Sequence, residues 1–139
     1  MVSNILPAVD ISGSALTAER FRLDVIASNM ANAQTTKDVN GGVYQKKQVL
    51  FESVLTDAVG GLGEGVRVAG VKRDDAPFPE VYKPNHPHAN EDGMVKMPNV
   101  NMIEEMVDMM TATRSYEANI KVVQGSKRMV ESALRIGQA

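Results

Sequence analysis

Residues 102–134 read MIEEMVDMMTATRSYEANIKVVQGSKRMVESAL, and the spacing of their apolar residues decides the fold. Ten positions succeed one another at alternating intervals of four and three residues, and eight of the ten are apolar: Met102, Met106, Met109, Thr113, Tyr116, Ile120, Val123, Lys127, Val130 and Leu134. Such intervals are those of a heptad repeat, in which one face of a helix packs along another helix. The pattern predicts a C-terminal helix over Asn101–Arg135.

The start of this helix is marked by its own residues. Pro98 precedes it, and Asn101 with Glu104 three positions later is a variant of the capping box. Glu104, Glu105 and Asp108 lie near the positive end of the expected helix dipole, which accounts for these carboxylates without an acid–base role.

A second helix is predicted at the other end of the chain, over Ser3–Ala33. Eight positions keep the same spacing and six of them are apolar: Val9, Ser12, Leu16, Glu19, Leu23, Ile26, Met30 and Ala33. Ser3 is a suitable N-cap, and Pro7 falls in the first turn, where a missing N–H costs little. The end is marked by residues that compete for backbone hydrogen bonds: Asn29, Asn32 and Gln34–Thr36.

The intervening residues, 37–97, carry most of the glycines and prolines, which indicates turns and short strands. Tyr44–Phe51 and Val66–Val71 are the strand candidates. The predicted fold is therefore mainly α, with two long terminal helices forming a coiled-coil-like core element around a small loop-rich β insert. We expect residues 1–36 and 98–139 to form one discontinuous helical domain and residues 37–97 to form the insert.

Composition excludes several classes of function. Only 4% of the 139 residues are aromatic and none is Trp, so large core residues are scarce. A formal net charge of -2 predicts no nucleic-acid partner, and the absence of Cys excludes disulfides and thiolate chemistry. The N-terminus lacks the basic region of a secretory signal peptide, and no run reaches the roughly 20 apolar residues of a membrane span.

Candidate chemical sites are weak. His86 and His88 flank Pro87 but have no third metal ligand at suitable spacing, and Gly60–Gly65 lacks the strand, helix and Lys-Ser/Thr of a phosphate-binding loop. No nucleophile has an adjacent base. We expect no catalytic residue, cofactor or metal, and hence no enzyme.

The Met-rich stripe has two interpretations. The two helices can pair within one chain, or the same faces can also meet helices of neighbouring subunits, for which thioether side chains are well suited. Two helices bury only their facing stripes and the insert offers few aromatic residues to cover more, which favours assembly.

Specific motifs resemble a known family. ASNMANAQTT at residues 27–36, preceded by Ser14, Leu16 and Ala18, resembles the N-terminal signature of bacterial flagellar rod, hook and hook-associated axial proteins. NVNMIEEMVD at 99–108 and RSYEAN at 114–119 are similar to the C-terminal signature of that family. YKPNHPHA at 82–89 and GMVKMPNV at 93–100 resemble its proximal rod members, as do 41–44 and 49–52. Lys37, Lys83 and Asn85 depart from the family pattern in local turns.

The resemblance implies a structural subunit of the flagellar basal-body rod that polymerises through its terminal helices and transmits torque in motility. It implies that the partners are other copies, other rod proteins and the flagellar type III export apparatus, with no direct membrane insertion. The chain would be exported to the rod in the periplasmic space without a cleaved signal peptide. The predicted assembly interface comprises Val9, Leu16, Leu23, Ile26, Asn29, Met30, Asn32, Met102, Met106, Met109, Tyr116, Ile120, Val123, Val130 and Leu134.

Two alternatives remain open. A soluble coiled-coil interaction module, such as an export adaptor, would bury the same seams and stay monomeric or dimeric. A metal-dependent hydrolase using His86 and His88 would require a stoichiometric metal.

Overall fold

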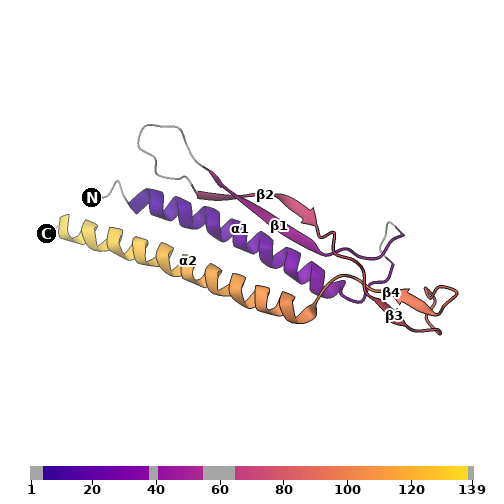
Figure 1. Cartoon of the computed structure of the whole chain (residues 1–139). Helices are drawn as coiled ribbons and strands as arrows, with labels where there is room; N and C mark the ends of the chain where they lie inside the picture. Colours follow the sequence, from indigo (N-terminus) through magenta and orange to yellow (C-terminus); the bar gives the residue numbers. More distant parts are fainter. Residues whose placement is uncertain (1–4, 38–40, 55–64, 138–139) are drawn as a thin grey trace. The chain divides into compact units, whose positions relative to one another are not determined.

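The computed structural model describes residues 5–37, 41–54 and 65–137, with the side chains of 5–7 excepted. Two helices flank a small β region, as predicted (Figure 1). The elements in chain order are α1 (Ile5–Ala31), β1 (Lys47–Val54), β2 (Gly65–Arg73), β3 (Glu80–Tyr82), β4 (Met94–Lys96) and α2 (Met102–Gly137). The predicted coiled-coil pairing stays a prediction. Neither helix holds an apolar stretch long enough to span a bilayer within the described residues.

Asparagine side chains define two of the helix ends. Asn101 caps α2, because its Oδ1 accepts the N–H of Ile103 at 3.0 Å. Asn32 follows the last residue of α1 and donates from its side chain to the carbonyl of Ser28 at 2.8 Å. α2 begins where the sequence predicted it, and α1 ends two residues before the predicted Ala33. The predicted N-cap Ser3 lies outside the described residues.

The strands form two separate two-stranded sheets. β1 pairs with β2, and β3 pairs antiparallel with β4, placing Val81 opposite Val95. The predicted strand at Val66–Val71 is confirmed within the longer β2. The strand predicted to begin at Tyr44 begins instead at Lys47, because the segment before it folds toward α1 to reach Asn29. β3 and β4, of three residues each, are too short to show a period in the sequence.

The chain divides into two compact units, and each contains part of both helices. Unit 1 comprises the described residues of Met1–Leu23, Leu50–Gly70 and Thr111–Ala139, and unit 2 comprises those of Asp24–Val49 and Val71–Met110. In unit 1, the hydroxyl of Ser14 accepts the N–H of Val66 at 3.1 Å, beside Gly65 with its φ of 129°. A Cβ on Gly65 would lie 2.1 Å from the Oγ of Ser14, so only glycine fits there.

The predicted stripe of α1 does face away from solvent: none of its eight positions is exposed. The predicted stripe of α2 is only half right. Met109, Tyr116, Ile120, Val123 and Val130 are half-buried, whereas Met102, Met106, Thr113, Lys127 and Leu134 are exposed. The least exposed face of α2 also keeps heptad spacing and comprises Glu105, Met109, Ala112, Tyr116, Asn119, Val123, Ser126 and Val130. Three positions of the prediction, Met106, Thr113 and Lys127, therefore lie one residue beyond the buried residues Glu105, Ala112 and Ser126.

Candidate assembly site

The first two turns of α2 carry an exposed apolar surface in unit 2. Ile103, Met106, Val107 and Met110 lie at intervals that place them on one side of a helix, and they are between 50% and 74% exposed. We call these four residues the outer patch. Adjacent exposed apolar side chains of this kind mark surfaces that bind other proteins.

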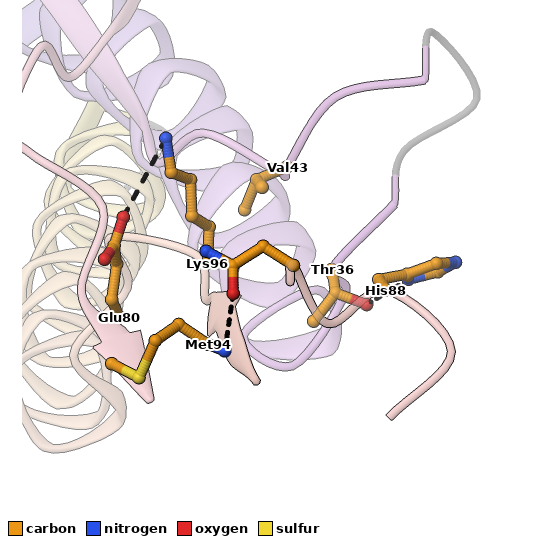
Figure 2. A pocket seen from close by; sticks show the side chains of 7 residues that line it. Thr36, Val43, Glu80, His88, Met94 and Lys96 are labelled. Carbon is orange, nitrogen blue, oxygen red and sulfur yellow. Dashed lines mark hydrogen bonds and ion pairs between the residues drawn. The ribbon is translucent and has the colours of Figure 1, made fainter. Parts of the chain in front are cut away.

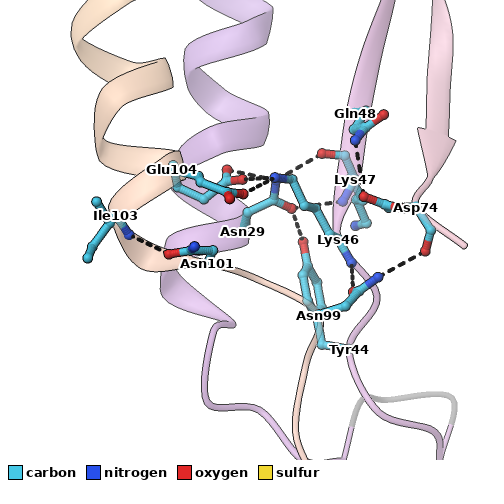
Figure 3. Close-up of polar contacts among 11 residues, drawn as sticks. Asn29, Tyr44, Lys46, Lys47, Gln48, Asp74, Asn99, Asn101, Ile103 and Glu104 are labelled. Carbon is cyan, nitrogen blue, oxygen red and sulfur yellow. Dashed lines mark hydrogen bonds and ion pairs between the residues drawn. The ribbon is translucent and has the colours of Figure 1, made fainter. Parts of the chain in front are cut away.

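The opposite side of these turns enters a buried polar cluster in the same unit (Figure 3). The cluster comprises Asn29, Tyr44, Lys46, Lys47 and Glu105, and we call it the polar centre. Asn29 and Glu105 are each only 1% exposed, and they are among the largest fully buried side chains of the described chain. The core of unit 2 is therefore partly polar, which requires its groups to be paired.

Asn29 uses the full hydrogen-bonding capacity of its amide. Its Nδ2 donates to the carbonyl of Lys47 at 2.8 Å and to Oε2 of Glu105 at 3.0 Å. Its Oδ1 accepts the hydroxyl of Tyr44 at 3.0 Å and the N–H of Lys47 at 3.0 Å. One side chain near the end of α1 thus binds the first residue of β1 and the first turn of α2.

Lys46 supplies the countercharge of Glu105. Its Nζ lies 2.8 Å from Oε1 of Glu105 and 3.8 Å from Oε2 of Glu104. Burial acts to lower the pKa of Lys46, but the hydrogen bond to Glu105 and the nearby charges of Glu105, Glu104 and Asp108 outweigh it, and the pKa is raised. Lys46 is therefore a firmly charged partner in a buried ion pair.

A hollow of about 220 Å³ lies beside the β3–β4 sheet in unit 2 (Figure 2). It is lined by Thr36, Val43, Glu80, His88, Asn90, Met94 and Lys96. Oγ1 of Thr36 and Nδ1 of His88 share a hydrogen bond of 2.9 Å. Nζ of Lys96 lies 3.9 Å from Oε1 of Glu80. A hydroxyl and an imidazole alone do not make a nucleophilic site, which also needs a group to orient the imidazole and donors for an oxyanion.

The two histidines contact each other without forming a metal site in the described part of the chain. The N–H of His88 donates to Nδ1 of His86 at 3.1 Å, and the two rings meet edge to face. No group of three or more His, Cys, Asp or Glu side chains gathers around them among the described residues.

Comparisons with known proteins decide the family. A family model described as "Flagella basal body rod protein" matches residues 10–37, and one described as "Flagellar basal body rod FlgEFG protein C-terminal" matches residues 91–136. The flagellar basal-body rod protein FlgC of Salmonella typhimurium is 46% identical, over 96% of this chain and 98% of its own length. The FlgC proteins of Bacillus subtilis and Borreliella burgdorferi are 43% and 38% identical, over 94% and 96% of this chain and 97% and 98% of their own lengths. The chain belongs to the FlgC family of flagellar basal-body rod proteins.

The two matching family models cover only part of the polar centre. Asn29 lies in the N-terminal match and Glu105 in the C-terminal match, whereas Tyr44, Lys46 and Lys47 lie between the two. Sequence reasoning treated Asn29 as an interface residue and Glu105 as a helix-dipole residue, and it did not single out Lys46. The signal available was a Glu within residues 102–110, most of which are apolar.

The predicted interface residues of this FlgC-family chain occupy three environments. Ile26 and Asn29 are buried within the subunit. Most others are half-buried: Val9, Leu16, Leu23, Met30, Asn32, Met109, Tyr116, Ile120, Val123 and Val130. Met102, Met106 and Leu134 are exposed, and Met106 belongs to the outer patch. Their role in assembly stays a prediction.

Proposed function

We propose that this chain is a structural subunit of the flagellar basal-body rod that assembles with other rod proteins through the exposed apolar side of α2. The observation that carries the proposal is its likeness, over nearly the whole length, to proteins named as basal-body rod proteins. The polymer would transmit torque as a stiff element, with the helices as its load-bearing part.

The outer patch supports a contact at the start of α2. Four large apolar side chains adjacent on one face lose contact with water when a neighbour covers them, at roughly 25 cal/mol per Å² of apolar surface. In unit 1, α2 carries further exposed apolar residues: Val122, Met129, Leu134 and Ile136. A contact repeated along a polymer gains from each copy, so single contacts need not be strong.

In this proposal, the half-buried residues of the predicted interface contact both their own subunit and neighbouring subunits. They pack the subunit on one side and become fully covered when neighbouring helices close around them, as in the coiled-coil-like core that the heptads predict. The division into a discontinuous helical domain, 1–36 with 98–139, and an insert at 37–97 belongs to the same proposal. Export through the flagellar type III apparatus, without a cleaved signal peptide, to a periplasmic rod completes it.

Replacing one residue of the outer patch tests the proposal. In a flagellated strain that lacks its own FlgC, the wild-type chain should restore swimming. Met106→Asp should be produced and exported but fail to enter the rod, because assembly would remove water from the new charge. Lys121→Asp, at an exposed position of α2, is the control and should still assemble. Normal rods with Met106→Asp would contradict the proposed contact.

The measured mass of the purified chain separates a rod subunit from a coiled-coil adaptor. A rod subunit should form higher oligomers as its concentration rises, because its contacts do not close on themselves. A mass fixed at monomer or dimer over the same range would favour the adaptor.

A further inference from the structure

The first turns of α2 have no unique apolar side. Six of the nine residues from 102 to 110 are apolar: Met102, Ile103, Met106, Val107, Met109 and Met110. Successive residues are about 100° apart around a helix, so these six form two overlapping stripes, displaced by one residue. Hydrophobic burial alone therefore distinguishes poorly between two rotations of this segment about its axis.

Glu105 distinguishes between them. Its carboxylate is 1% exposed, with the ammonium of Lys46 at 2.8 Å from one oxygen and the amide of Asn29 at 3.0 Å from the other. Rotation of α2 by one residue would carry the carboxylate out of hydrogen-bonding distance of both groups. Two buried polar side chains, Asn29 and Glu105, and the half-buried Lys46 would then lose partners, which costs far more than exchanging one Met for another.

We propose that Asn29, Lys46 and Glu105 determine the rotation of the first turns of α2, and thereby which apolar residues the subunit presents to its neighbours. These three residues act by positioning and do not themselves contact the neighbour. The claim about which residues α2 presents to neighbours rests on the proposed function. The claim about the rotation of α2 involves unit 2 alone.

Buried polar groups are well attested as determinants of helix register. A single buried Asn specifies alignment in coiled coils at some cost in stability, and replacing a buried ion pair by apolar residues is often neutral or stabilising. Asn29, with both donors and both acceptor positions used, is a strongly directional form of this device. We therefore expect an apolar substitute of the Lys46–Glu105 pair to fold well but to present α2 in more than one rotation, while Asn29 keeps its hydrogen bonds to Tyr44 and Lys47.

The chain contains no Cys, so single introduced thiols can report the rotation of α2. Met106→Cys lies on the exposed side and Met109→Cys on the half-buried side. In the otherwise wild-type chain, a thiol reagent should modify the Met106→Cys variant several-fold faster than the Met109→Cys variant. In the background Lys46→Met, Glu105→Leu, the two rates should become similar while circular dichroism shows unchanged helix content.

A matched background controls for loss of charge. Lys96→Met with Glu80→Leu removes an exposed ion pair of the same unit and should leave the ratio of the two thiol rates unchanged. If this double background does not fold, Glu105→Leu alone is the second test, since Lys46 then keeps Glu104 as a partner, and the same fall in ratio is expected. A ratio that stays at the wild-type value in a folded apolar background would overturn the proposal.

Rod assembly separates this inference from the proposed function. We expect the Lys46→Met, Glu105→Leu variant to be soluble and helical but absent from rods. If the thiol rates become similar and rods still form, the polar centre sets the rotation and the proposed contact at the outer patch is wrong. If the ratio is unchanged, the positioning role is wrong whether or not rods form.

Discussion

Replacing Lys46 by Met removes the countercharge from a carboxylate that is 1% exposed. Breaking a buried ion pair at one partner typically costs about 3–5 kcal/mol, because the other charge stays buried. Glu105 keeps its hydrogen bond from Asn29, and it can also take up a proton, so the lower end of that range applies. For a chain of this size, a loss of about 3 kcal/mol lowers the melting temperature by roughly 10 °C.

The assay is thermal unfolding of the monomer at neutral pH, followed by circular dichroism. Lys96→Met is the control, because its ion pair with Glu80 is exposed and should contribute under about 1 kcal/mol. Adding Glu105→Leu to Lys46→Met should restore most of the lost stability, since no buried charge then remains. If Lys46→Met is no more destabilising than Lys96→Met, the reasoning about the polar centre is refuted.

Three further predictions concern pH, a glycine and the histidines. The pKa of Lys46 is raised above its usual 10.5 in the folded chain. Its contribution to the free energy of unfolding is therefore complete below pH 10.5 and is lost as the pH rises through the raised pKa. The difference in stability between wild type and Lys46→Met should therefore shrink in alkaline titrations, and a difference that grows would contradict this sign. Gly65→Ala should destabilise the chain by about 1–3 kcal/mol, because the φ of Gly65 is positive and an added Cβ would meet the side chain of Ser14. Gly70→Ala is the control, because its Cβ would meet nothing within 4 Å, and it should change stability by less than about 1 kcal/mol. Denaturant titrations measure both effects. Replacing His86 and His88 together by Gln should leave swimming normal, and a loss of motility with normal incorporation into the rod would show that the loop has a role of its own.

The ends of the helices could be read from the sequence because their signals are local. Asn101 caps α2 through its own side chain, two residues from the N–H that it accepts. The heptad spacing of α1 likewise requires only counting along the chain, and all of its predicted positions face away from solvent. Local chemistry of this kind is independent of which distant segment packs nearby.

The polar centre could not be read in the same way. Asn29 and Glu105 are 76 positions apart, and nothing in the sequence brings them together. Hydrophobic patterning favoured the stripe through Met102 and Met106, whereas the buried ion pair with Lys46 turns the helix by one residue. A polar residue that is paired in the core thus overrides an apolar pattern that is nearly symmetrical about the helix.

Electron cryomicroscopy of basal bodies from cells that depend on this chain can show directly whether the chain is a rod subunit and whether the outer patch contacts its neighbours. We expect the chain to lie in the rod with the outer patch (Ile103, Met106, Val107 and Met110) covered by neighbouring subunits, and Glu105 still paired to Lys46 inside the subunit. A rod without this chain, or one in which these four side chains face solvent, would contradict the account.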